Sequence, residues 1–228
     1  MRVRVATALG LTALTVLALP ACSTEAEPAS TSSTHSRKQP GTADQHGAPL
    51  PSAALDKRLL DVSDLGTGYT RKPERPAQHD DVTVLGCPAL NGLGGDAATG
   101  GSLDFPRRAK ATFTYGHGGS EVSEELYSDT SGKLSGGTNR IFEAITSCPQ
   151  YQLLAGGIAV DTTTQKLPPP QAGEERWSQL MTFSAGGRDT VVKQTAVRDG
   201  NVLVVVSGSP ALVDQHLTKA LTKATAAR

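Results

Sequence analysis

Apolar and polar residues alternate with period two in residues 109–115, where the odd-numbered positions are apolar or aromatic and the even-numbered positions are polar. Such alternation predicts a β-strand with one buried face. A glycine-rich loop at residues 116–119 leads to a second run, in which Val122 and Leu126 fall on one side. The two runs therefore predict an antiparallel hairpin.

The strongest local pattern lies near the C-terminus. Two Val-rich runs within residues 191–206 flank Asp199-Gly200, a dipeptide that accepts the positive φ angles of a tight hairpin turn. Residues 202–206 are apolar on both sides, which predicts a strand at the centre of a sheet. Ser209-Pro210 predicts the start of a closing helix. The apolar stripe of this helix would comprise Val213, Leu217, Ala220, Leu221 and Ala224.

Weaker patterns fill the rest of residues 55–228. They predict helical turns at 55–65 and 87–95, a longer helix at 129–148, strands at 158–165 and 177–184, and a surface loop at 72–81. Strands that are joined by hairpins and interrupted by helices make an α+β domain. We expect an antiparallel sheet with helices on one face.

The N-terminus has the pattern of a secretory signal. Two arginines within the first four residues precede an uncharged, mostly apolar run of 15 residues at 5–19, which is shorter than a membrane span. Residues 1–21 are therefore expected to be removed. Cys22 directly follows the small residue Ala21, and this placement resembles the lipobox of bacterial lipoproteins. The resemblance implies that the Cys22 thiol carries fatty acyl chains such as palmitate and becomes the new N-terminus.

The number of cysteines supports this interpretation. The chain has three, and lipidation of Cys22 leaves Cys87 and Cys148 to form one disulfide in an oxidising compartment. The alternative is ordinary signal cleavage nearby, which leaves a secreted protein with an odd thiol. For Cys87 and Cys148 the alternative is two free structural cysteines, since no Cys-x-x-Cys pair or histidine cluster indicates a redox or metal site.

Composition divides the remaining chain into two parts. Residues 22–54 are mostly Ser, Thr, Ala, Pro and Gly, which predicts a flexible tether with an average reach of roughly 30 Å. Residues 55–228, 174 in number, suit a single domain with one core. Without the signal, 20 basic residues face 22 acidic ones, so charge gives no reason to expect binding to nucleic acid.

The order of the predicted elements carries a family resemblance. A helix ending at Asp64-Leu65-Gly66-Thr67-Gly68-Tyr69 is followed by a Cys87-Pro88 turn, a hairpin, a helix ending at Ser147-Cys148-Pro149, a Pro-rich loop before Trp177, a Val-rich hairpin and a final helix. This order is similar to the PknH-type extracellular sensor domains of mycobacterial receptor kinases, and to actinobacterial lipoproteins that carry such a domain. The resemblance implies a domain outside the membrane that binds a ligand in a cleft.

No set of residues predicts catalysis. His117 lies in a loop that faintly resembles the oxyanion loop of some esterases, but the chain has no Gly-x-Ser-x-Gly elbow to present a nucleophile. We therefore expect no enzyme, no cofactor and no metal site. Two groups of glutamates are expected to be solvated charges rather than paired catalytic acids: Glu121, Glu124 and Glu125, and Glu174 and Glu175.

Two aromatic residues are the predicted ligand contacts. Trp177 and Tyr115 each combine apolar area with a polar tip, and with Tyr127 they would line an amphipathic pocket. A core position is the alternative for Trp177. The sequence thus predicts a lipid-anchored protein on the extracytoplasmic face of the cell membrane, with a non-catalytic ligand-binding or sensor-like domain and an unknown envelope ligand or protein as its partner. The alternative is an accessory envelope lipoprotein that acts through protein or wall contacts.

Overall fold

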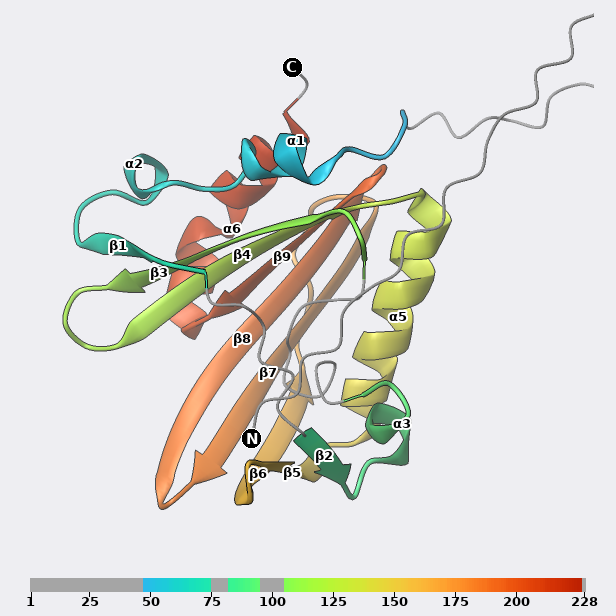
Figure 1. Cartoon of the computed structure of the whole chain (residues 1–228), viewed down its shortest axis with the longest axis vertical. Helices are drawn as coiled ribbons and strands as arrows, with labels where there is room; N and C mark the ends of the chain where they lie inside the picture. Colours follow the sequence, from blue (N-terminus) through green and yellow to red (C-terminus); the bar gives the residue numbers. More distant parts are fainter. Residues whose placement is uncertain (1–46, 75–81, 95–104, 227–228) are drawn as a thin grey trace, which may run out of the picture. The chain divides into compact units, whose positions relative to one another are not determined.

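The structure, a computed structural model, describes residues 47–74, 82–94 and 105–226. Within these ranges nine strands pair into one antiparallel sheet: β1 (Tyr69–Lys72), β2 (Val82–Leu85), β3 (Arg108–Tyr115), β4 (Ser120–Ser128), β5 (Gln150–Ala155), β6 (Ile158–Lys166), β7 (Glu175–Ala185), β8 (Arg188–Asp199) and β9 (Val202–Gly208). Their order across the sheet is β1-β3-β4-β9-β8-β7-β6-β5-β2 (Figure 1). The described residues also form five helices: α1 (Ser52–Asp56), α2 (Val62–Leu65), α3 (Pro88–Asn91), α5 (Ser131–Ser147) and α6 (Pro210–Thr225).

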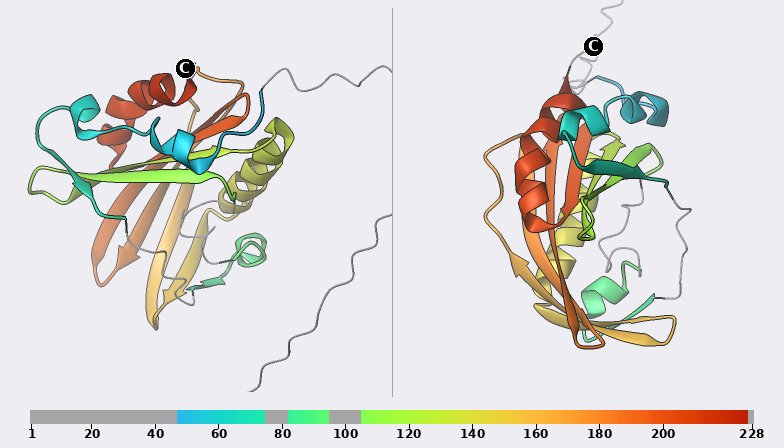
Figure 2. Two further views of the ribbon diagram at one scale, coloured as in Figure 1. Left: turned by 45° about the horizontal axis from the view of Figure 1, so that its top comes forward. Right: turned by 90° about the vertical axis from the view of Figure 1, so that its left-hand side faces the viewer.

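β9 is the inner strand on which both faces of the sheet are built. It pairs with β4 and β8, and all five residues from Val202 to Val206 are buried. Its even-numbered valines pack in one cluster with α6, whereas Leu203 and Val205 pack in another cluster with α5. Because neighbouring residues of a strand point to opposite faces, α5 and α6 cover opposite faces of the sheet (Figure 2).

The antiparallel α+β fold is therefore confirmed, but our expectation that the helices lie on one face is wrong. A strand that is apolar on both faces must be covered on both, because its side chains would otherwise meet water. The Val-rich sequence of residues 202–206 already carried this requirement.

The face covered by α6 also receives the first segment of the domain. This segment, residues 52–65, contains α1 and α2 and is called the α1–α2 segment. Four of its leucines pack in the same apolar cluster as α6: Leu55, Leu59, Leu60 and Leu65. From the sheet come side chains of β1, β3, β4 and β9, among them Phe113, Val122 and Leu126, and from the helix come Leu212, Val213, Leu217, Ala220 and Ala224. The α1–α2 segment and α6 thus share one apolar layer.

The opposite face is covered by α5, which packs across β6, β7, β8 and β9. Leu134 and Phe142 of α5 contact the cluster around Leu203, while the C-terminal part of α5 packs on β5 and α3. The predicted disulfide is confirmed: Cys87 at the start of α3 is bonded to Cys148 at the end of α5, with the Cα atoms 5.7 Å apart. The bond therefore fixes α3 to the end of the helix that it packs against.

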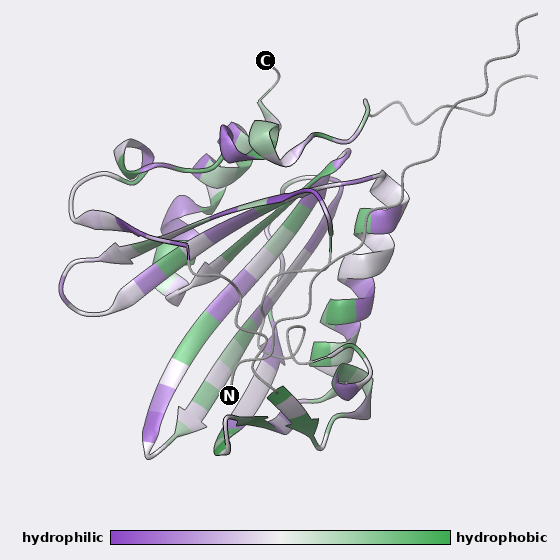
Figure 3. Ribbon diagram, in the orientation of Figure 1, coloured by the Kyte–Doolittle hydropathy of each residue, from purple (hydrophilic) through white to green (hydrophobic). Residues whose placement is uncertain are grey.

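The long, strongly patterned elements agree with their predictions. The hairpins β3–β4 and β8–β9, the strands β6 and β7 and the helices α5 and α6 all occur at the predicted places. Figure 3 shows short polar and apolar bands following one another along β8. The tight turn between β8 and β9 consists of Gly200 and Asn201, one residue later than predicted, with φ of 57° at Gly200.

Short elements differ from the predictions. The predicted helix at 55–65 is two short helices: α1 ends at Asp56, and Asp61 caps α2 through a capping box with Asp64. The strands β1, β2 and β5 were not predicted, since each has at most six residues and little alternation of its own.

The disulfide is expected to stabilise the domain strongly. Cys87 and Cys148 are 61 residues apart, and closure of such a loop reduces the entropy of the unfolded chain by an amount worth about 4 kcal/mol. Chemical denaturation of a Cys87→Ser/Cys148→Ser variant should show this loss in the free energy of unfolding. Reduced wild type should match the variant. An unchanged denaturation midpoint in both would contradict a stabilising role.

Candidate functional site

Trp177, the first predicted ligand contact, lies beneath α5. Its indole ring is 6.1 Å from the ring of Phe142, and its Nε1–H donates to Asn139 Oδ1 at 2.8 Å. Phe142 and Asn139 both belong to α5. Trp177 is half-buried and shares the apolar cluster of this face with Tyr127. The contacts of Trp177 are therefore those of a residue that holds α5 on the sheet.

Tyr115, the second predicted contact, lies on the other face. It is 45% exposed, and its ring is 4.7 Å from the ring of Tyr69, which belongs to the cluster of α6. The structure therefore does not bring Tyr115 and Trp177 together in one pocket. A ligand role for either residue alone stays a prediction, and so does lipidation of Cys22, which lies outside the described residues.

Glu174 and Glu175 fix the loop that precedes Trp177. Arg198 of β8 is only 6% exposed. Its Nη1 donates to Glu174 Oε2 at 2.6 Å and to the Gly200 carbonyl at 2.9 Å, and its Nη2 donates to Glu175 Oε1 at 2.9 Å. The bond from Arg198 lowers the pKa of Glu175. These glutamates are thus partners of a buried guanidinium and also stay in contact with water, since their side chains are 36% and 32% exposed.

The most unusual polar residue of the domain is Glu124 in β4. It is 1% exposed, and it shares its face of the strand with Val122 and Leu126. Its Oε2 accepts a hydrogen bond of 2.6 Å from the backbone N–H of Leu60, while its Oε1 has no partner among the described residues. The carboxyl group therefore lies in the apolar layer between β4 and the α1–α2 segment.

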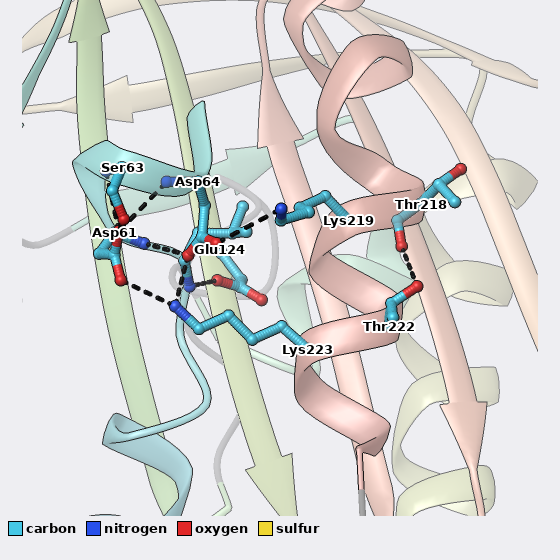
Figure 4. Close-up of polar contacts among 9 residues, drawn as sticks. Asp61, Ser63, Asp64, Glu124, Thr218, Lys219, Thr222 and Lys223 are labelled. Carbon is cyan, nitrogen blue, oxygen red and sulfur yellow. Dashed lines mark hydrogen bonds and ion pairs between the residues drawn. The ribbon is translucent and has the colours of Figure 1, made fainter. Parts of the chain in front are cut away.

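Charged groups of α2 and α6 surround this carboxyl group (Figure 4). Lys223 Nζ donates to Asp61 Oδ2 at 3.0 Å and also to Asp64 Oδ2, and Lys219 Nζ lies 3.7 Å from Asp64 Oδ1. Asp61 itself accepts hydrogen bonds from Ser63 and from the backbone of Asp64. The two lysines of α6 are thus engaged with the two aspartates, which fixes α2 to α6.

The environment shifts the pKa of several of these groups. Burial raises the pKa of Glu124 to about 7, an effect that the bond from Leu60 N–H and the charge of Lys223 only partly offset. Bonds from Ser63 and Lys223 hold the pKa of Asp61 well below its usual range. Burial acts to lower the pKa of Lys223, but its bonds with Asp64 and Asp61 raise it overall. Glu124 is the member of this cluster whose charge changes near neutral pH.

Glu124 and Glu125 correct the expectation of solvated glutamates. Glu125 is also buried, where it accepts from Lys110 Nζ at 2.6 Å and from the Tyr127 hydroxyl. Glu121 is half-buried and forms an ion pair of 2.6 Å with Lys72. A signal for Glu124 was present in the sequence, because a residue between Val122 and Leu126 at period two falls on the buried face of a strand.

A shallow depression lies at the end of the sheet formed by β6, β5 and β2, away from the strands on which α6 packs. It has a volume of about 550 Å³ and is lined by residues of β2, β5 and β6 and their connections: Leu85, Gly86, Gln150, Tyr151, Gln152, Asp161, Thr162 and Thr163. Gln152 and Asp161 are register partners, and the Gln152 amide donates to the Asp161 carboxylate at 2.9 Å. Amide, hydroxyl and carboxylate groups there suit a neutral, polar ligand that hydrogen-bonds along the sheet.

A second depression, of about 360 Å³, lies where β1 ends beside β3. Arg71, Lys72 and Lys110 contribute positive charge to its lining, and Glu74 contributes negative charge. Lys72 and Lys110 are already paired with Glu121 and Glu125. Within residues 47–74, 82–94 and 105–226, no three His, Cys, Asp or Glu side chains are arranged to hold a metal ion.

Comparison with known proteins gives a fold likeness. No protein-family model matches the chain, and no curated protein matches it in sequence. Among solved structures the chain is similar to the extracellular domain of PknH from Mycobacterium tuberculosis, with a TM-score of 0.58 and 14% sequence identity. The match covers 77% of this chain and 97% of that domain. The likeness shows that the two chains share a fold.

Substitution of the two predicted aromatic contacts should have unequal effects on stability. Trp177→Phe removes the partner of Asn139 Oδ1 in a half-buried position, so we expect a loss of about 1 kcal/mol or more in the free energy of unfolding. Tyr115→Phe should change it by less than about 0.5 kcal/mol, because the outer part of Tyr115 is exposed. Denaturation followed by circular dichroism measures both. Equal effects would contradict the structural role of Trp177.

Proposed function

We propose that this chain is a lipoprotein that is anchored in the cell membrane through acylated Cys22 and carries an extracytoplasmic, non-catalytic, sensor-like domain that binds a ligand. The observation that carries the proposal is the fold likeness to an extracellular domain, which spans 97% of that domain. The disulfide Cys87–Cys148 supports an oxidising compartment, since structural disulfides are rare in the cytosol. None of the helices in the described ranges is long and apolar enough to cross a membrane.

The surface best suited to the ligand is the depression over β2, β5 and β6. Its side chains offer donors and acceptors on a broad, open surface, with Leu85 as an exposed apolar group at its edge. Binding without chemistry needs such positioned polar groups, and it does not need an activated nucleophile or base. A polar envelope component is therefore the expected class of ligand.

The alternative function is that of an accessory envelope lipoprotein that contacts another protein. Exposed apolar side chains on the face of the sheet that points away from α5 favour this alternative. Leu85 is 45% exposed, and Leu154 of β5 and Val191 of β8 are also exposed. By the alternation of each strand, all three point away from the α5 side. Such residues are typical of contact surfaces when they form a continuous patch.

The anchor can be tested by cell fractionation and intact mass. Wild-type protein should be found in the membrane fraction with the added mass of acyl chains on Cys22. Cys22→Ser should lose this mass and leave the membrane fraction. Cys87→Ser/Cys148→Ser is the matched control, because it removes the other two cysteines and should keep the anchor. Wild type that is soluble and carries no acyl mass would contradict the proposed anchoring.

The ligand can be tested by native mass spectrometry of the full chain purified from its own host in mild detergent. Wild type should carry an additional small-molecule mass. Thr163→Arg places a long charged side chain in the depression and should abolish that mass. Thr190→Arg, at an exposed position of β8 outside the depression, should retain it. No bound mass in wild type would favour the accessory function, and equal binding by both variants would exclude this depression.

A further inference from the structure

Glu124 lies at the contact between β4, an inner strand of the sheet, and the α1–α2 segment, which packs on the sheet through side chains. β4 is held by backbone ladders to β3 on one side and to β9 on the other. The α1–α2 segment, in contrast, consists of two helices of five and four residues, joined to Glu124 through the N–H of Leu60. Water can therefore reach the carboxyl group with least disruption if the α1–α2 segment moves and β4 stays in place.

The carboxylate form of Glu124 is poorly compensated in the closed arrangement. Its register partners on β3 and β9 are Ala111 and Val206, which offer no charge. Oε1 has no hydrogen-bond partner among the described residues. A buried carboxylate with one neutral donor destabilises the packed state, whereas the protonated form removes most of that penalty.

The other charged groups packed around this position are already engaged. From α2 and its cap come Asp64 and Asp61, and from α6 come Lys219 and Lys223, which pair with those aspartates. The positive charge of Lys223 acts on Glu124 in one direction and the negative charge of Asp64 acts in the other. Arg58, between α1 and α2, donates to the Ala224 carbonyl at the end of α6.

One further titratable pair belongs to the same apolar layer. The Tyr69 hydroxyl and His216 Nε2 are 2.6 Å apart and buried. Burial lowers the pKa of His216 and raises that of Tyr69. His216 therefore destabilises the packed state as pH falls, which is opposite in sign to the effect expected of Glu124.

We propose that Glu124 is a proton-binding site that controls how firmly the α1–α2 segment is held on the sheet, with firm attachment at mildly acidic pH and weaker attachment at neutral and alkaline pH. The chain passes through this segment on its way from Cys22 to the sheet. Protonation of one buried group would thus change how firmly the first helical segment of the described domain is held on the sheet. The proposal does not depend on the identity of a ligand or on ligand binding.

The direction follows from proton linkage. With the segment attached, the pKa of Glu124 is about 7, compared with 4.5 for an ordinary glutamate. The attached state therefore binds the proton more tightly than the detached state. Its advantage is complete below about pH 4.5, decreases as pH rises to about 7, and stays at its lowest value above that.

Amide hydrogen exchange of the full chain between about pH 5.5 and pH 8 tests the proposal. After correction for the intrinsic exchange rate, the equilibrium constant for opening of residues 55–65 should rise about tenfold or more across this range. Amides of β9 should show no comparable local opening. Glu124→Gln keeps an oxygen that accepts from Leu60 N–H. The rise of the opening constant with pH should disappear in this variant, and only the opposite pH dependence that His216 causes should remain.

Glu121→Gln is the matched control, since it removes a carboxylate of the same strand that is in contact with water, and it should behave as wild type. Lys223→Met is a second variant that does not alter Glu124. Because Lys223 lowers the pKa of Glu124, its removal should shift the transition to higher pH. Opening of residues 55–65 that is independent of pH in wild type, the same dependence in Glu124→Gln, or an unshifted transition in Lys223→Met would each overturn the proposal.

Discussion

β9 has apolar side chains on both faces, so the sheet around it needs a cover on both faces. α6 and the α1–α2 segment supply one cover, and α5 supplies the other. The disulfide between α3 and the end of α5 stabilises the helices on the α5 face near the short edge strand β2. The placement of α5 and α6 on opposite faces of the sheet follows from this burial of β9.

Two buried charges at these covers differ in how well they are compensated. Arg198, on the side of α5, has two carboxylates and a carbonyl as partners, so its guanidinium stays charged and stabilises the loop before Trp177. Glu124, on the side of α6, has one backbone donor and, among the residues that the structure describes, no ion pair of its own. A well-compensated charge makes a contact rigid, whereas a poorly compensated carboxyl group makes a contact sensitive to protons.

Much of the sheet could be predicted because long strands carry their own pattern. The hairpins β3–β4 and β8–β9, the closing helix and the disulfide are encoded by residues close to each turn or by the small number of cysteines. The strands β1, β2 and β5 are stable only as partners of longer strands, which local alternation does not reveal. Burial of Glu124 was readable from its position between Val122 and Leu126. The pairing of Arg198 with Glu174 was not, because it joins residues on separate elements.

The fold likeness at 14% identity is consistent with the same physics. A pattern of apolar positions, two covers and short turns can be satisfied by many sequences, so a shared fold says little about the side chains that recognise a ligand. Residues that break the pattern carry more information. An apolar residue at position 124 would fill the layer between β4 and the α1–α2 segment without charge, and the chain has a carboxyl group there instead. Departures of this kind from local packing rules are expected where a protein uses a residue for something other than stability.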